Sequence, residues 1–184
     1  MRIIAGEFRS RRLKSIPGDG TRPTPDRLRE TLFNILQTRI AGATFLDAYA
    51  GTGAVGIEAL SRGASQVFFL ERDRTALDAI RQNLAALGAE TRSTVVPGAV
   101  LRTLPAYRAD IVFLDPPYSL EREYREALDF LGGNPPPLVI AQHSVRLPLA
   151  ERYGALERIR VVKQGDNALS FFSPPAAPES EENV

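Results

Sequence analysis

Short apolar runs and amphipathic stretches alternate along the chain from Thr44 onward. Continuous apolar runs of this length are typical of strands that are buried on both faces of a parallel sheet. They predict strands at 44–49, 66–71, 93–97, 109–114 and 137–142. Helices are expected between them, most clearly at 73–87, where apolar residues recur at helical spacing. The alternation is typical of βαβ units, so the predicted fold class is a doubly wound α/β domain.

The two ends of the chain add an antiparallel pair and an arm to this pattern. Segments 155–163 and 168–172 predict two strands joined at a turn that includes Asn167. With them, the expected total is a mostly parallel sheet of seven strands. Residues 1–16 alternate weakly and predict a short hairpin or extended arm.

A helix is expected after the arm, with Thr24 as its N-cap and apolar residues at helical spacing to about Thr38. The length of 184 residues is within the usual range of one compact domain. Within it we expect the arm and its helix at 1–40, the main α/β unit at 41–173 and a disordered tail at 174–184. That tail contains proline and glutamate and almost nothing apolar.

Composition excludes several classes of function. Hydrophobic residues make up 43% of the chain, and no apolar run approaches the ~20 residues of a membrane span. We therefore expect a cytoplasmic protein with no membrane partner. The absence of cysteine excludes disulfides and thiolate catalysis, and a single histidine, His143, argues against a histidine-built metal site. No metal is expected, and His143 is assigned no role.

Positive charge is concentrated at the amino end. The net charge of the chain is +1, whereas residues 1–30 carry eight basic and four acidic side chains, which gives +4. The arm contains most of these cations, namely Arg2, Arg9, Arg11, Arg12 and Lys14. Such a cluster could neutralise the phosphates of a polyanion, or it could be the solvated face of a strand.

A glycine-rich turn follows the first strand of the α/β unit. Gly51, Gly53 and Gly56 match the pattern G-x-G-x-x-G, and Glu71 ends the next strand twenty residues after Gly51. This layout indicates a nucleotide-like cofactor, either a dinucleotide or S-adenosylmethionine. Asp47 favours the second, because a carboxylate this close would repel a pyrophosphate but can accept a hydrogen bond from an α-ammonium group.

A second motif, Asp115-Pro116-Pro117-Tyr118, follows the fourth predicted strand. An exocyclic amine on a nucleobase is a poor nucleophile, so a site must redirect its lone pair without a strong base. Asp115 can accept one N–H and a carbonyl of the proline pair the other, while Tyr118 offers a face on which an extruded base can stack. The residues themselves therefore lead to an exocyclic-amine methyltransferase.

The chain resembles a known family over nearly its whole length. The resemblance is carried by MRIIAGEFRSRRL at the amino end, TRPTPDRLRETLFNIL (Thr21 to Leu36), LDAYAGTGAVGIEALSRGA (Leu46 to Ala64) and DIVFLDPPY (Asp110 to Tyr118). These segments are similar to the bacterial small-subunit ribosomal RNA guanine-N2 methyltransferases of the RsmD type. Members of that family are class I S-adenosylmethionine-dependent enzymes with a Rossmann-like sheet, and they act on an assembled or assembling small subunit.

The resemblance implies roles for individual residues. Asp47, Gly51 and Gly53 would hold the methionyl end of S-adenosylmethionine, Glu71 its ribose hydroxyls, and Gly98 and Ala99 its adenine. The cofactor site would also include Tyr49 and Arg72, and Asp115, Pro116, Pro117 and Tyr118 would be catalytic. The residues expected to bind ribosomal RNA are Arg2, Arg9, Arg11, Arg12 and Arg22.

Alternatives remain open at this point. A DNA adenine-N6 methyltransferase fits the tetrapeptide equally well, although the chain has no obvious target-recognition domain. A methyltransferase acting on glutamine would more typically carry Asn in place of Asp115. From another class, a non-catalytic RNA-binding assembly factor with a vestigial pocket would show no affinity for the methyl donor.

Overall fold

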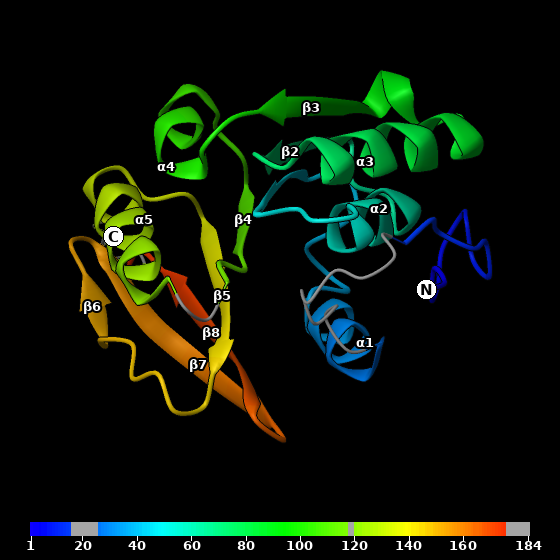
Figure 1. Ribbon diagram of the computed structural model, residues 1–184. Helices are drawn as coiled ribbons and strands as arrows, with labels where there is room; N and C mark the ends of the chain where they lie inside the picture. Colours follow the sequence, from blue (N-terminus) through cyan, green and yellow to red (C-terminus); the bar gives the residue numbers. More distant parts are fainter. Residues whose placement is uncertain (16–25, 118–119, 176–184) are drawn as a thin grey trace, which may run out of the picture.

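The centre of the molecule is one mixed sheet of eight strands in the order β3-β2-β1-β4-β5-β8-β7-β6 (Figure 1). This computed structural model describes residues 1–15, 26–117 and 120–175. The strands are β1 (Thr44–Ala48), β2 (Gln66–Glu71), β3 (Ser93–Pro97), β4 (Ile111–Leu114), β5 (Leu138–Ser144), β6 (Arg152–Tyr153), β7 (Leu156–Gln164) and β8 (Asn167–Ser173). The strands β3, β2, β1, β4 and β5 run parallel, whereas β8, β7 and β6 pair in antiparallel fashion. The predicted doubly wound, mostly parallel fold is confirmed.

The strand count differs from the prediction by one, because β6 was not expected. It has only two residues, whose partners are the first two residues of β7. Two residues are too few to show the alternation of apolar and polar positions by which a strand is recognised in a sequence. The antiparallel pair of β7 and β8 is confirmed.

Several strand ends also differ from the prediction. β4 begins at Ile111 and not at 109. Just before it, the Asp110 carboxylate accepts hydrogen bonds from the backbone N–H and the hydroxyl of Thr44, at 2.8 and 2.7 Å. β5 continues to Ser144, since Ser144 pairs with Asn167 of β8. Asn167 is therefore the first residue of β8, and the turn before it consists of Gly165 and Asp166.

The helices occupy the connections between strands, as expected. They are α1 (Asp26–Ile35), α2 (Ala54–Ser61), α3 (Arg74–Leu87), α4 (Val100–Thr103) and α5 (Glu121–Gly133), with short 3-10 segments at Glu90–Arg92 and Leu104–Ala106. The carboxylate of Asp73 caps α3 by accepting the N–H of Ala76 at 2.8 Å. α1 ends before the predicted Thr38, and its predicted cap, Thr24, lies outside the described residues.

Helices cover both faces of the sheet (Figure 1). One core cluster joins α1, α2, α3 and the arm to inward side chains such as Phe45 and Phe113. The other joins α4 and α5 to the opposite face, with Tyr124 and Phe172 among its members. The two layers hold the carboxyl ends of the parallel strands in fixed register, which is the edge where α/β folds bind ligands.

The amino-terminal arm is less regular than a hairpin. Its one bridge among the described residues is antiparallel and joins Arg2 to Arg12. Ile3, Phe8 and Leu13 are buried in the core. The arm is therefore packed on the domain through apolar side chains.

Within residues 1–15, 26–117 and 120–175, no helix has both the length and the hydropathy that a membrane span requires.

Candidate active site

The carboxyl ends of β1, β2 and β4 lie side by side, and the two motifs follow them. The glycine-rich turn begins after β1 and ends where α2 starts. Gly53 has φ 81°, a left-handed conformation that side chains rarely adopt. A Cβ on Gly56 would lie 2.3 Å from the ring of Phe69 on β2. The turn thus needs glycine at Gly53 for its backbone and at Gly56 for close packing of α2 on the sheet.

Glu71, at the end of β2, is bound directly to the glycine-rich turn. Its Oε2 accepts the N–H of Gly51 at 2.8 Å, and its Oε1 accepts the N–H groups of Arg72 and Asp73 at 2.7 and 2.8 Å. The spacing of twenty residues in the sequence is therefore a direct contact in space. The carboxylate is held rigidly at the point where a ribose hydroxyl would be read.

Asp47 lies in β1 beneath the same turn and is 2% exposed. Its Oδ2 accepts the N–H of Gly56 at 2.8 Å. Burial raises the pKa of Asp47 well above its usual value, the Gly56 hydrogen bond opposes this, and the charges of Asp115 and Glu71 raise it further. Two neighbouring carboxylates thus add negative charge around Asp47, which favours a cationic ligand and disfavours a pyrophosphate.

Tyr49 joins the turn to the other face of the sheet. It is one of two non-glycine residues with positive φ among the described residues, at 66°. Burial raises the pKa of its phenol, and the neighbouring carboxylate of Glu123 on α5 adds to this rise. Such backbone strain at a ligand edge is often retained for function. The side chain of Arg72 is exposed nearby.

Gly98 and Ala99 follow β3, next to Glu71. The N–H of Gly98 donates to the carbonyl oxygen of Glu71 at 2.9 Å, and Ala99 caps the short helix α4. The predicted cofactor residues therefore form one continuous row across the ends of β1, β2 and β3.

Asp115, Pro116 and Pro117 follow β4, which lies beside β1. The N–H of Asp115 donates to the carbonyl oxygen of Ala48, at 3.4 Å, so the chain remains next to β1 as it leaves the sheet. Leu114, the last residue of β4, pairs with Ala48, the last residue of β1, so the second motif adjoins the candidate cofactor edge. Tyr118, the last member of the tetrapeptide, lies outside the described residues.

Two residues that the sequence did not single out contact this turn or adjoin it. Tyr124 of α5 is fully buried, and its hydroxyl lies 2.9 Å from the carbonyl oxygen of Pro116 and 2.8 Å from that of Gln142. Gln142 of β5 is 2% exposed. A polar residue at the end of the apolar run 137–142 was the available signal for Gln142, whereas no pattern reveals a hydroxyl that binds backbone carbonyls.

The arm presents its arginines to solvent. Arg2, Arg9, Arg11 and Arg12 are all exposed, and the guanidinium of Arg11 donates to the carbonyl oxygen of Ala86 at 2.8 Å. The bridge between Arg2 and Arg12 places their side chains on one face. Arg22 lies outside the described residues.

The arm also reaches the glycine-rich turn through one side chain of α3. Asn83 accepts the N–H of Lys14 at 2.7 Å and donates to the carbonyl oxygens of Lys14 and Thr52 at 3.3 and 3.2 Å. The basic arm and the candidate cofactor edge therefore share one hydrogen-bonded residue.

The arm is held by a buried ionic cluster. Glu58 of α2 accepts the N–H groups of Ile4 and Ala5 at 2.8 and 3.0 Å, and its carboxylate pairs with Arg62 at 2.8 Å. Arg29 of α1, also fully buried, donates to the carbonyl oxygen of Arg2 at 2.6 Å and lies 3.9 Å from Glu58. Charged groups thus fix the backbone of the arm while its arginines stay exposed.

His143 lies within β5, not after it as the sequence suggested. Its Nε2 is 2.8 Å from the hydroxyl of Ser170, and its Nδ1 is 2.8 Å from the carbonyl oxygen of Ser144. Burial lowers its pKa. Both ring nitrogens are therefore engaged within the sheet, and the ring supports the structure. Among the described residues, no group of three or more His, Cys, Asp or Glu side chains could hold a metal ion.

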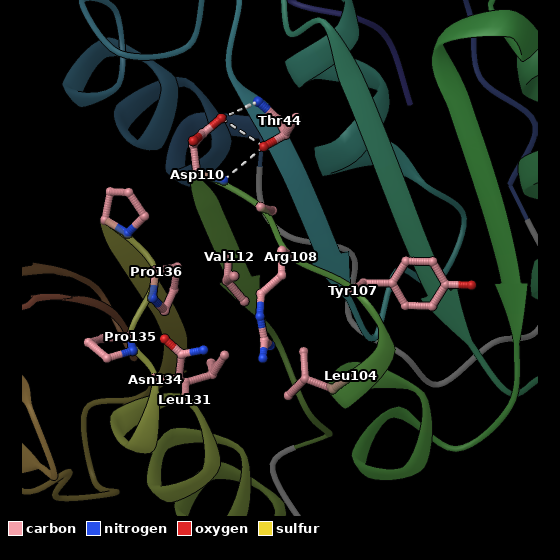
Figure 2. A pocket seen from close by; sticks show the side chains of 12 residues that line it. Thr44, Leu104, Tyr107, Arg108, Asp110, Val112, Leu131, Asn134, Pro135 and Pro136 are labelled. Atoms are coloured by element: carbon pink, nitrogen blue, oxygen red, sulfur yellow. Dashed lines mark hydrogen bonds between the residues drawn. The ribbon is translucent and has the colours of Figure 1, made fainter.

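A separate cavity of about 270 Å³ lies at the amino ends of the parallel strands, opposite the two motifs. Figure 2 shows the hydrogen-bonded pair of Thr44 and Asp110 at one end of this cavity, with Arg108 pointing into the space between Val112 and Leu104. These residues precede or begin β1 and β4. The cavity thus lies at the amino ends of the strands, away from both motifs.

The fold is that of class I methyltransferases. The Escherichia coli protein yhhF, described provisionally as a methyltransferase, has the same fold, with a TM-score of 0.82, 35% identity and coverage of 96% of this chain and 99% of yhhF. An RNA methyltransferase of Salinibacter ruber in complex with S-adenosyl-L-homocysteine, at 17% identity and a TM-score of 0.66, covers 88% of this chain and all 100% of its own, and shows the fold alone.

The family model described as "Conserved hypothetical protein 95" matches residues 1–173, and the chain belongs to this family. A relative from Haemophilus influenzae, named ribosomal RNA small subunit methyltransferase D, is 42% identical over 123 residues, which are 64% of each chain. YlbH of Bacillus subtilis, named provisionally as an rRNA methyltransferase, is 32% identical over 183 residues, 94% of this chain and 98% of YlbH. The resemblance to the RsmD type is confirmed.

Proposed function

We propose that this chain transfers a methyl group from S-adenosylmethionine to the exocyclic N2 of a guanine in small-subunit ribosomal RNA. The observation that carries the proposal is the pairing of Leu114 with Ala48 at the ends of β4 and β1, which places Asp115 at the edge of the sheet that also holds Asp47. It brings a candidate amine acceptor beside a candidate cofactor carboxylate. The names of the relatives in Haemophilus influenzae and Bacillus subtilis support ribosomal RNA as the substrate.

The residues present fit the cofactor. Asp47 is buried and its negative charge is opposed by two neighbouring carboxylates, so a bound α-ammonium would stabilise its ionised form. Glu71 is fixed by three backbone N–H groups and still has lone pairs for ribose hydroxyls. Tyr49, Gly51, Gly53, Arg72, Gly98 and Ala99 line the same edge. S-adenosylmethionine would supply a methyl group on a sulfonium, which is a good leaving group.

Asp115 and the proline pair would orient the acceptor amine. The Asp115 carboxylate accepts one N–H of the guanine amino group, which directs the nitrogen lone pair toward the methyl group. The second N–H of the amine needs a carbonyl oxygen of the proline pair. The carbonyl oxygen of Pro117 is less available for it, because it already accepts the N–H of Leu120 at 2.8 Å. The Pro116 carbonyl accepts the Tyr124 hydroxyl and keeps a second lone pair for the amine. Tyr118 would stack on the extruded base.

Exposed arginines of the arm would hold the RNA. Arg2, Arg9, Arg11 and Arg12, together with Arg22, would neutralise backbone phosphates, which positions the RNA without reading its sequence. Asn83 joins the arm to the glycine-rich turn, so phosphates bound there would lie near the cofactor edge. An assembled or assembling small subunit is the proposed form of the substrate.

The test is transfer of labelled methyl groups from S-adenosylmethionine to small subunits that lack the modification, followed by nucleoside digestion and mass spectrometry. N2-methylguanosine from the subunits is the expected product. Naked ribosomal RNA and DNA are tested in parallel. Product in DNA alone would replace the proposal with adenine-N6 methylation, and the absence of cofactor binding in calorimetry would indicate a non-catalytic RNA-binding protein.

A further inference from the structure

Gln142 lies beside Asp115 on the same face of the sheet. Leu114, the last residue of β4, is in register with Ala141 of β5, so Asp115, which follows β4, leaves the sheet at the level of Gln142. Phe113 and Ile140, two residues earlier, share one core cluster. Because alternate residues of a strand point to one face, Asp115 and Gln142 share the face of that cluster.

The side-chain amide of Gln142 has no hydrogen-bond partner among the described residues. Its Oε1 is buried and unpaired, and no described residue bonds its Nε2. By contrast Asn83, also a buried amide, makes three hydrogen bonds. Native interiors seldom retain an unpaired amide unless a partner arrives later.

Gln164 is the other amide with an unpaired buried oxygen among the described residues. It is only partly buried, and two strand positions separate β7 from β5. Gln142 is the one that adjoins the catalytic turn.

Tyr124 fixes Gln142 relative to that turn. Its hydroxyl lies within hydrogen-bond distance of the carbonyl oxygens of both Pro116 and Gln142. A hydroxyl has one hydrogen, so the two carbonyls share a single donor at a fully buried position. The Tyr124 hydroxyl therefore places the backbone of Gln142 close to that of Pro116.

We propose that the Gln142 amide is a specificity-determining group that recognises the base edge beside the amine held by Asp115. This inference rests on the proposed function. The edge of guanine presents the N2 amine, then the N1–H donor, then the O6 acceptor. Oε1 of Gln142 accepts N1–H and Nε2 donates to O6, so the base supplies both missing partners. Adenine offers only the N1 acceptor next to its amine, and leaves the amide oxygen buried without a hydrogen bond.

The test uses reconstituted small subunits that carry guanine or 2-aminopurine at the position methylated by the wild type. 2-Aminopurine keeps the N2 amine but lacks N1–H and O6. The wild type should prefer guanine by roughly 10- to 100-fold in kcat/KM, as expected for loss of a bidentate contact. Gln142→Leu should reduce this preference to about twofold, within the limits of additivity. Its affinity for S-adenosylmethionine should not change.

The control variant is Gln66→Leu, at the start of β2, whose amide donates to the Thr94 hydroxyl at 3.1 Å. It should retain the full preference for guanine. Thermal unfolding separates recognition from folding, because removing an unpaired buried amide should leave the midpoint of Gln142→Leu unchanged or raised.

Two results would overturn the inference, and they distinguish an error in the role of Gln142 from an error in the proposed function. If the wild type forms N2-methylguanosine and Gln142→Leu keeps the wild-type preference, the assignment of Gln142 is wrong while the proposed function stands. If the wild type methylates adenine and not guanine, both are wrong.

Discussion

The hydroxyl of Tyr124 lies 2.9 Å from the carbonyl oxygen of Pro116, eight residues earlier in the chain. The tyrosine is fully buried on α5, and its ring packs in the core on that face of the sheet. The turn that carries Asp115 is therefore held from below by a helix and not only by its own prolines. Preorganisation of this kind is what a reaction that depends on alignment requires.

Replacement of Tyr124 by Phe should uncouple the turn from the helix. The two carbonyl oxygens would lose their shared donor, so we expect a loss of about 1–3 kcal/mol in the free energy of unfolding. Turnover should fall roughly 10- to 100-fold through misplacement of Asp115, with little change in cofactor affinity. Steady-state kinetics, calorimetry with S-adenosylmethionine and denaturant unfolding give these three quantities.

The matched control is Tyr153→Phe. Tyr153 of β6 is also buried, and its hydroxyl accepts the N–H of Ala150 at 2.9 Å, but it lies at the far end of the sheet. The Tyr153→Phe variant should lose about as much stability as Tyr124→Phe but keep the turnover of the wild type. If Tyr124→Phe kept full turnover as well, the hydroxyl would have no positioning role.

Substitution of Asp47 by Asn should stabilise the free protein at pH 7 and weaken cofactor binding. Burial raises the pKa of Asp47, so folding disfavours its charge at neutral pH, whereas Asn keeps an oxygen for the Gly56 N–H. The contribution of Asp47 to stability is therefore lost as the pH rises from its ordinary pKa through its raised pKa. Thermal unfolding against pH should show the advantage of Asn shrinking as the pH falls toward 4.

Asp110 supplies a control, because its pKa is shifted in the opposite direction from that of Asp47. The hydrogen bonds from Thr44 lower the pKa of Asp110, so its charge contributes stability above its ordinary pKa and the contribution is lost as the pH falls through the lowered value. Asp110→Asn should be less stable than the wild type at pH 7, and that difference should vanish only in more acidic solution. Equal pH profiles for the two variants would contradict the assigned shifts.

The sequence predicted those parts of the site that follow strand ends. Asp47, Glu71 and Asp115 could be placed together because parallel strands bring their carboxyl ends to one edge. Tyr124 could not be found, since its partners are backbone carbonyls that no residue pattern records. The sequence predicted a short hairpin or extended arm, and backbone hydrogen bonds do join its two halves. Its attachment through Glu58, which accepts two of its N–H groups, could not be predicted. Such contacts depend on tertiary packing, which local patterns do not contain.

Glu58→Gln should destabilise the attachment of the arm. Glu58 is fully buried, and its carboxylate pairs with Arg62 and accepts two N–H groups of the arm, whereas Arg29 keeps Asp26 at 3.1 Å. Loss of the Glu58 charge should therefore cost about 1–3 kcal/mol. Denaturant unfolding should show this loss, and limited proteolysis should cut the arm faster. Glu126→Gln, which breaks the exposed pair with Arg122, should change stability by less than about 1 kcal/mol. Similar losses in the two variants would mean that the buried cluster does not hold the arm.

Replacement of Arg9 and Arg12 by Ala should weaken RNA binding mainly through the salt-dependent part of the free energy. Both side chains are exposed, and neither donates to a described residue as Arg11 does to Ala86. If each neutralises one phosphate, the slope of log K against log salt should become shallower by about 0.7–0.9 per arginine removed. Filter binding to unmodified small subunits between low and moderate salt measures this slope. Arg152→Ala, on β6 at the other end of the sheet, should leave it unchanged. A slope that is the same in all three proteins would mean that the arginines of the arm only solvate its surface, and the RNA would then have to be held by another face of the molecule.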